Sequence, residues 1–282
     1  MSIKSIPQSG GLKKSGFFLV GFVLEAMVFA ILPLSACLPI NRLLYLHGGL
    51  TILLLVAALL LRTSERGRKF WQVFYVLFVG GAAILLSTLF SDRLLDLFRL
   101  ATGSPPWIAI AKLSESLLRV IPIFVLTMVI GADRRSLYLH RGKLGLGLAV
   151  GIAGFVGFAG LAFIPLAKQA GMLNKLLSLS PWIFIFVLAN GFMEELLYRG
   201  LFLKRFEPFL GKGLSNLLTA SVFTLSHVQV TYASDVFKFL LVVFPLALIW
   251  GYLMQKTDSL WGSVLFHAGA DCMIIFGIYA SM

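Results

Sequence analysis

NGFMEELLYRG, residues 190–200, sets two adjacent carboxylates and an arginine inside an otherwise apolar run of membrane-spanning length. A charge at the centre of a bilayer costs about 2.5 to 3.5 kcal/mol on insertion scales, so an acid in the membrane normally faces a partner or a water-filled cavity. In a helix, Glu195 and Arg199 are i,i+4 neighbours, whereas Glu194 points to another side. We therefore predict an ion pair between Glu195 and Arg199, which leaves Glu194 without a cation on its own helix.

The composition around this stretch is that of a membrane protein. Of the 282 residues, 59% are hydrophobic and only 13% are charged, whereas soluble domains are roughly 45 to 50% apolar. A net charge of +12 would suggest a nucleic-acid partner for a soluble protein. Here the basic residues instead concentrate in the connections on one side of the predicted helices, as the positive-inside rule requires. The chain is predicted to be an all-α, polytopic bundle in a lipid bilayer, with no nucleic-acid partner.

Charges, prolines and glycines divide the apolar sequence into candidate spans, each close to the roughly 17 to 25 residues that a helix needs to cross a bilayer. Charge sorting places the N-terminus in the cytoplasm. The seventh segment is short and has the least certain ends. We predict about 8–9 membrane-spanning helices, at residues 16–40, 43–61, 70–90, 107–130, 144–167, 181–203, 213–231, 236–255 and 259–280.

Several polar groups outside residues 190–200 are interpreted as structural. Lys112, Glu115 and Arg119 share one helical face, on which Glu115 can pair in both directions. Glu25 is a lone acid in the first span, and we interpret it as a satisfied packing contact. Residues 91–106 alternate charges with leucines and end in two prolines, which predicts a short amphipathic helix at the membrane surface.

The two cysteines, Cys37 and Cys272, lie far apart in apolar runs. This pattern indicates neither a disulfide framework nor a cysteine-based zinc site. We expect two buried thiols. The glycines of the fifth span, between residues 145 and 160, are spaced as a small-residue face for close helix packing.

Two later motifs add titratable groups to the apolar sequence. FTLSH, residues 223–227, ends at His227, and near the C-terminus His267 and Asp271 are i,i+4, which places them on one helical face. Taken singly, each histidine is more often a hydrogen-bonded structural residue than a site. The chain has only four histidines, however, and two of them occur with Glu194 and Asp271 in its last third.

These three motifs in this order, Glu194-Glu195-x-x-x-Arg199, Phe223-x-x-x-His227 and His267-x-x-x-Asp271, resemble the signature of the CPBP intramembrane protease family. That family includes the CAAX prenyl endopeptidases and many bacterial proteins of the ABI type. The resemblance divides the chain into N-terminal helices of unassigned function, residues 1–143, and a protease core, residues 144–282. It implies an integral protein of a prokaryotic plasma membrane.

The resemblance also implies roles for the motif residues. Glu194 and His227 would activate a water, His267 would polarise or protonate near the scissile carbonyl, and Asp271 would orient His267. The pair Glu195 and Arg199 would support the site, with Phe223. In the family the last motif ends in Asn or Asp, and an ionised Asp271 cannot donate a hydrogen bond to an oxyanion. The substrate implied is a peptide or lipidated protein presented in the membrane.

Two questions stay open at this stage. The first is the cofactor: the sequence does not choose between a metal-free mechanism and one in which Glu194, His227, His267 and Asp271 serve as zinc ligands with an open position for water. The second is activity itself. The alternatives are a catalytically inert relative that acts as a binding or immunity protein, and a proton-coupled transporter, which would show an inverted repeat that this sequence lacks.

The protease interpretation makes a geometric demand. Glu194, His227, His267 and Asp271 come from three separate segments and must converge on one cavity that water can reach. A separation of more than about 12 Å between the two histidines would be too large for any shared substrate or metal.

Overall fold

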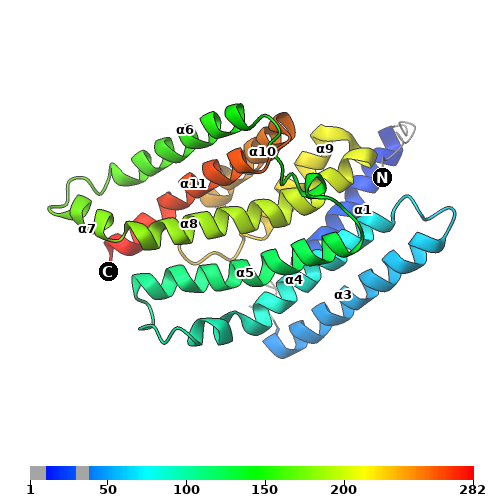
Figure 1. Ribbon diagram of the computed structural model, residues 1–282, viewed down its shortest axis with the longest axis horizontal. Helices are drawn as coiled ribbons and strands as arrows, with labels where there is room; N and C mark the ends of the chain where they lie inside the picture. The colour runs from blue at the N-terminus through cyan, green and yellow to red at the C-terminus, as the bar shows by residue number, and fades with distance from the viewer. Residues whose placement is uncertain (1–10, 30–37) are drawn as a thin grey trace.

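The computed structural model describes residues 11–29 and 38–282, and over these residues the chain is helical and has no β-strand. The predicted all-α class is therefore confirmed for the described part. Figure 1 shows most of the long helices side by side along the longest axis of the molecule. The α-helices are α1 (Gly11–Phe29), α3 (Ile40–Thr63), α4 (Trp71–Asp96), α5 (Pro105–Val129), α6 (Leu144–Phe163), α7 (Met172–Ser178), α8 (Ser180–Glu194), α9 (Lys204–Leu225), α10 (Val236–Thr257) and α11 (Trp261–Ala280).

Within the described residues, six helical segments are long and apolar enough to cross a membrane: α3, α4, α6, the continuous stretch Ser180–Leu225, α10 and α11. The helix α5 has the length but carries Lys112, Glu115 and Arg119. These segments make the protein a multi-pass membrane protein, while the finer count of 8–9 spans stays a prediction.

The acidic helix is longer than the predicted span 181–203. The helix α8 continues without interruption through η2 (Glu195–Leu203), a π-helical segment, into α9. It passes Pro208 and breaks at Gly211, whose φ of 77° is a left-handed conformation that glycine adopts without strain. The second part of α9 ends at Leu225, so His227 lies just beyond the helix end. The predicted sixth and seventh spans are thus separate helices on the two sides of this break, and the sixth runs on past Pro208.

The predicted amphipathic helix over residues 91–106 does not form. The helix α4 runs on to Asp96, and a short turn then leads directly to α5. The side chain of Ser104 caps α5 by accepting a hydrogen bond from the backbone N–H of Trp107. Proline fits the first helical turn, where its missing N–H costs nothing. The two prolines therefore begin α5 instead of ending a surface helix.

Glu25 differs from its interpretation as a satisfied contact. The side chain is buried in α1, 1% exposed, but neither carboxylate oxygen has a hydrogen-bond partner among the described residues. The prediction of a packing contact was therefore right about burial and wrong about hydrogen bonding. A sequence shows where an acid lies along a helix, but it does not show which groups of other helices face that acid. Cys272 is buried as expected, whereas Cys37 lies outside the described residues.

The segments predicted to be basic and cytoplasmic meet at one end of the bundle, where α9 lies in Figure 1. There the backbone N–H of Lys143 donates to the carbonyl of Thr257 at 2.7 Å, and Lys204 forms an ion pair with Asp258 at 3.1 Å. The end of α11 lies at the opposite end, beside α7. The connections predicted to be cytoplasmic thus lie at one end of the molecule. That this end faces the cytoplasm stays a prediction.

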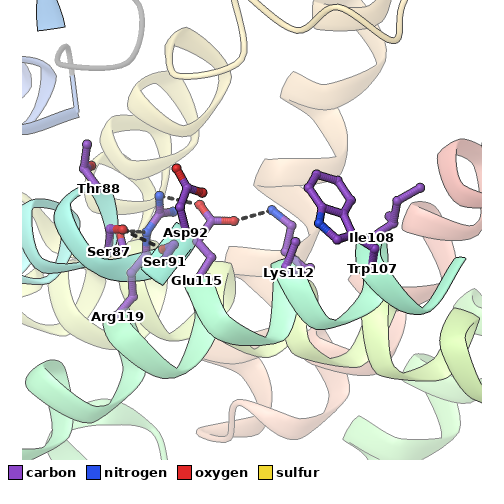
Figure 2. A pocket seen from close by; sticks show the side chains of 10 residues that line it. Ser87, Thr88, Ser91, Asp92, Trp107, Ile108, Lys112, Glu115 and Arg119 are labelled. Atoms are coloured by element: carbon purple, nitrogen blue, oxygen red, sulfur yellow. Dashed lines mark hydrogen bonds and ion pairs between the residues drawn. The ribbon is translucent and has the colours of Figure 1, made fainter. Parts of the chain in front are cut away.

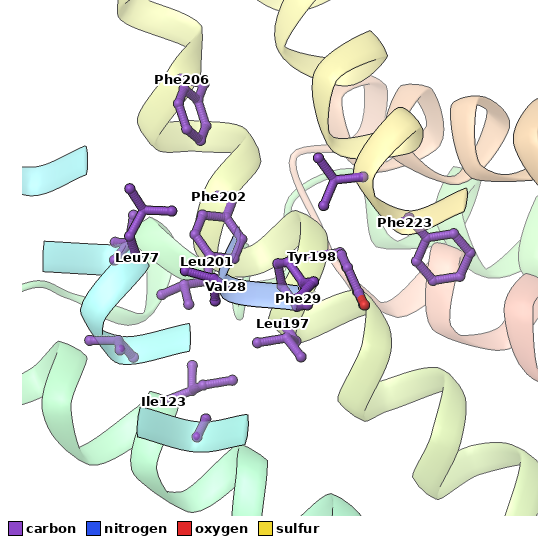
Figure 3. Packing of buried hydrophobic residues seen from close by; sticks show 14 of the residues in the cluster. Val28, Phe29, Leu77, Ile123, Leu197, Tyr198, Leu201, Phe202, Phe206 and Phe223 are labelled. Carbon is purple, nitrogen blue, oxygen red and sulfur yellow. The ribbon is translucent and has the colours of Figure 1, made fainter. Parts of the chain in front are cut away.

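The helices before residue 144 pack directly on those after it. The ring of Phe29 on α1 stacks on Tyr198 at 4.4 Å, and the hydroxyl of Ser116 on α5 donates to the carbonyl of Ala189 on α8 at 3.0 Å. Figure 3 shows buried side chains from both parts in one hydrophobic core. The N-terminal helices therefore support the acidic helix from one side, and the division at residues 143 and 144 stays a prediction.

Candidate active site

The ion pair expected from spacing is present at the junction of α8 and η2. Arg199 Nη1 donates to Glu195 Oε1 at 2.8 Å, and both side chains are fully buried. Arg199 Nη2 also donates to the backbone carbonyl of Ala247 on α10, at 3.2 Å. The guanidinium lies over the ring of Phe223, 4.3 Å from its centroid. This pair therefore ties the acidic helix to α9 and α10.

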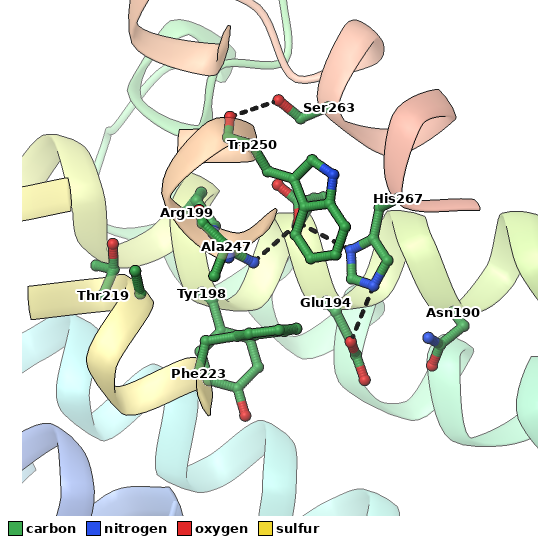
Figure 4. Close-up of polar contacts among 12 residues, drawn as sticks. Asn190, Glu194, Tyr198, Arg199, Thr219, Phe223, Ala247, Trp250, Ser263 and His267 are labelled. Carbon is green, nitrogen blue, oxygen red and sulfur yellow. Dashed lines mark hydrogen bonds and ion pairs between the residues drawn. The ribbon is translucent and has the colours of Figure 1, made fainter. Parts of the chain in front are cut away.

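His267 on α11 is held by both glutamates (Figure 4). Its Nδ1 lies 2.9 Å from Glu195 Oε1, and its Nε2 lies 3.4 Å from Glu194 Oε2. Glu195 accepts from Arg199 as well, so an ionised Glu195 requires the proton of His267 to be on Nδ1. The π-helical segment begins at Glu195, and such segments within α-helices are frequent at functional sites.

Asp271 lies one turn after His267 but does not form the orienting hydrogen bond that the resemblance implies. Its Oδ1 is 3.7 Å from Nε2 of His267, and its Oδ2 accepts from Asn190 Nδ2 at 3.0 Å. The hydrogen bond that orients the His267 ring comes from Glu195 instead. The i,i+4 spacing brought Asp271 and His267 to one helical face, as predicted. Asn190 on α8 nevertheless lies closer to the Asp271 carboxylate than His267 does.

His227 approaches the same region from the end of α9. Its Nδ1 lies 2.7 Å from the backbone carbonyl of Phe223, and the Phe223 ring contacts the rings of His227 and His267 at centroid distances of 4.5 and 5.8 Å. The separation of the two histidines cannot exceed the sum of those distances, which is below the limit of about 12 Å.

Sequence reasoning missed three residues that shape the site. Trp250 on α10 stacks on the His267 ring at 4.0 Å with an angle of 6° between the planes. Tyr198 donates to Ser226 Oγ at 2.8 Å, next to His227. Tyr198 lies inside the stretch 190–200 and Ser226 inside FTLSH, so both stood in recognisable motifs, whereas Trp250 resembles any other packing aromatic of an apolar helix.

The predicted zinc ligands do not form a metal site as they stand. Among the described residues no three histidine, cysteine, aspartate or glutamate side chains come together in an arrangement that could hold a metal ion. A catalytic zinc needs three protein ligands at about 2.0 to 2.2 Å. His227 Nδ1 and His267 Nδ1 are both engaged in other contacts.

A cavity of about 340 Å³ lies between α4 and α5, beside the site and not in it (Figure 2). None of the four predicted catalytic residues lines it. The predicted triplet does, as a pair of ion pairs: Lys112 Nζ and Glu115 Oε2 at 2.6 Å, and Arg119 Nη2 and Glu115 Oε1 at 2.5 Å. Arg119 also donates to Ser87 Oγ on α4 at 2.9 Å, which supports the structural interpretation of the triplet.

Comparison with known families agrees with the motifs. Residues 176–273 match the family model described as type II CAAX prenyl endopeptidase Rce1-like, and this stretch contains every predicted site residue. No curated protein and no solved structure matches the chain. The resemblance stated from the sequence is confirmed over the matched stretch: from α7 to α11 the chain is similar to the CAAX protease family, as the Rce1-like model describes it.

Proposed function

We propose that the protein is an intramembrane endopeptidase that hydrolyses a peptide bond in a membrane-held tail, prenylated or CAAX-like, with a water activated by Glu194 and His227. The observation that carries the proposal is the arrangement of His267, whose Nδ1 is held by Glu195 while its Nε2 faces Glu194 and Asp271. Three motifs from separate helices thus meet in one place, inside the stretch that matches the protease family.

The hydrogen bonds of His227 suit it to accept a proton. A backbone carbonyl only accepts, so the contact with Phe223 requires the proton of a neutral His227 to be on Nδ1. The other nitrogen, Nε2, then carries a lone pair. A base needs such a lone pair directed at the water that attacks the substrate.

The contacts of His267 suit it to the opposite task. Its Nδ1 donates to Glu195 and its Nε2 faces two carboxylates, so His267 carries a proton on both nitrogens, as an imidazolium, when Glu194, Glu195 and Asp271 are ionised. An N–H preorganised in a site of low dielectric stabilises the oxyanion that forms when water attacks a carbonyl. Trp250, stacked on the ring, holds it in that direction.

The proposed reaction has two steps. Glu194, with His227, takes a proton from water while the water oxygen forms a bond to the carbonyl carbon, and the carbonyl oxygen becomes an oxyanion beside His267. The carbon–nitrogen bond then breaks, and the leaving amine receives the proton that Glu194 took. Glu195 and Arg199 hold the acidic helix and the His267 ring and exchange no proton.

The testing experiment is a cleavage assay on the detergent-purified full chain with an internally quenched peptide whose cysteine is farnesylated and followed by three residues. Its matched probe lacks the farnesyl group. We expect wild-type cleavage, no cleavage by Glu194→Gln, and the same melting temperature for both proteins, because glutamine preserves volume and removes the base. Equal activity of the glutamine variant would remove the assignment of Glu194.

A chelator arm separates the mechanisms. Activity that survives dialysis against a strong chelator supports the metal-free route, and activity that disappears and returns with added zinc supports the metal-assisted one. A folded wild-type protein that cleaves neither probe would favour the inert binding or immunity protein.

A further inference from the structure

Asn190 is a polar residue of the site that none of the three motifs contains. It lies on α8 one turn before Glu194, so the two side chains share a helical face. Only 8% of Asn190 is exposed. In Figure 4 the Asn190 carboxamide and the Glu194 carboxylate both lie below the ring of His267.

The contact with Asp271 determines which way the amide points. Asn190 Nδ2 donates to Asp271 Oδ2 at 3.0 Å, and an ionised carboxylate accepts from an N–H and not from a carbonyl oxygen. The oxygen Oδ1 of Asn190 is therefore directed away from Asp271. This orientation follows from the chemistry of the pair.

Two buried acceptors, one helical turn apart on α8, are then incompletely satisfied. Among the described residues, no group donates a hydrogen bond to Asn190 Oδ1, and the group that faces Glu194 Oε2 is Nε2 of His267, an ion-pair contact of 3.4 Å that leaves a lone pair of this oxygen free. Buried polar atoms are nearly always paired, because an unpaired one loses its hydration without compensation. A single water molecule has two O–H groups, which is the number that these two acceptors require.

We propose that Asn190 is a further catalytic residue that binds the nucleophilic water, an inference that rests on the proposed function. Asn190 Oδ1 accepts one hydrogen of this water, and Glu194 Oε2 accepts the other. The oxygen lone pair is then turned toward the substrate. As the water oxygen bonds to the carbonyl carbon, Glu194 receives its hydrogen, and the hydrogen on Asn190 stays on the new hydroxyl.

This assignment also gives Asp271 a role that needs no donated hydrogen bond. By accepting from Nδ2 it keeps Oδ1 of Asn190 directed at the water. Asp271 is thus a positioning residue for Asn190, and an asparagine at position 271 would accept from Nδ2 through its own carbonyl oxygen equally well.

The chain contains a matched control in Asn216. It is also 8% exposed, its Nδ2 also donates one hydrogen bond, to the carbonyl of Leu248 at 2.9 Å, and its Oδ1 also lacks a donor among the described residues. Asn216 lies in α9, and its hydrogen bond goes to the Leu248 backbone and to no predicted catalytic residue. The Asn216→Ala variant therefore measures how much stability the protein loses when a buried carboxamide outside the site is removed.

The experiment compares Asn190→Ala with Asn216→Ala in the farnesylated-peptide assay. We expect both to lower the melting temperature, and only Asn190→Ala to lower kcat, by roughly 10²-fold, with KM within about twofold. The pH–rate profile of Asn190→Ala should show a lower rate at every pH, with inflection points at the same pH values as in wild type. The reason is that Asn190 binds the water and has no proton that titrates. If Asn190→Ala does not fold, Asn190→Leu, which keeps the volume, replaces it.

Asp271→Asn separates this role from a structural one. If Asn190 served only to hold the charge of Asp271, Asp271→Asn would lose at least as much activity as Asn190→Ala, and we expect it to lose less. A kcat of Asn190→Ala within about twofold of wild type, together with an inactive Glu194→Gln, would overturn the role of Asn190 alone. An active Glu194→Gln would instead overturn the proposed function, and this inference with it.

Discussion

At the scale of single residues, the site depends on charges that are buried together. Glu195 and Arg199 are fully buried, and Glu195 also holds His267. Breaking a buried ion pair by removing one partner leaves the other charge without compensation, which costs about 3 to 5 kcal/mol. The pair therefore couples the stability of the acidic helix to the orientation of the catalytic ring.

Arg199→Ala is expected to reduce the folded yield and the melting temperature as well as activity, because it leaves Glu195 ionised in an apolar setting. Lys238→Ala is the control, since Lys238 pairs with Asp235 at 3.1 Å in an exposed contact, and exposed pairs contribute about 0 to 1 kcal/mol. The measurement is thermal unfolding in detergent. A wild-type melting temperature for Arg199→Ala would contradict the structural role of the pair.

At the scale of helices, close packing of α6 on α11 sets where His267 lies. Part of the glycine face predicted on α6 makes this contact: Gly147, Gly151 and Gly154 face α11, whereas Gly145, Gly157 and Gly160 have open space around them. Across the contact, a Cβ added to Gly262 would lie 2.5 Å from the backbone carbonyl oxygen of Gly147. Two backbones can approach this closely only where both residues are small.

Gly262→Ala is accordingly predicted to destabilise the protein by about 1 to 3 kcal/mol, because the backbone of α6 must move away. Gly277→Ala, in the same helix, has no atom within 4 Å of the added Cβ. There alanine is expected to be neutral or stabilising by up to about 1 kcal/mol, through its higher helix propensity. Unfolding curves in detergent for the two variants measure the difference. Equal shifts in both would show that α6 and α11 are not packed in this way.

At the scale of the whole molecule, one carboxylate joins three segments at the basic end of the bundle. Asp258, in the turn between α10 and α11, pairs with His140 at 2.9 Å and with Lys204 at 3.1 Å. Burial would raise the pKa of Asp258, but the hydrogen bond and charge of Lys204, together with His140, outweigh burial and hold the pKa below its usual value. The ionised form of Asp258 is therefore favoured in the folded protein.

A lowered pKa gives a definite pH dependence. The contribution of Asp258 to stability is present above its unfolded pKa of about 3.9 and is lost as the pH falls through the lower folded value. Asp258→Asn should thus reduce the melting temperature at pH 7 and leave it nearly unchanged at the acid end of that window. Asparagine tolerates the positive φ of 52° at this position. A deficit that persists undiminished at low pH would show that the charge is not the cause.

The helical class, the ion pair of Glu195 and Arg199 and the triplet around Glu115 could all be read from the sequence, because each depends on contacts within one helix, where spacing determines which side chains meet. The family could be recognised as well, since three motifs occur in a fixed order. Only the tertiary structure decided which side chains of different helices contact one another. His267 is oriented by Glu195 and not by its own neighbour Asp271, Asp271 takes Asn190 instead, and Trp250 covers the ring. Helix rotation, the break at Gly211 and the π-helical segment set these partners, and they follow from packing that no local pattern encodes.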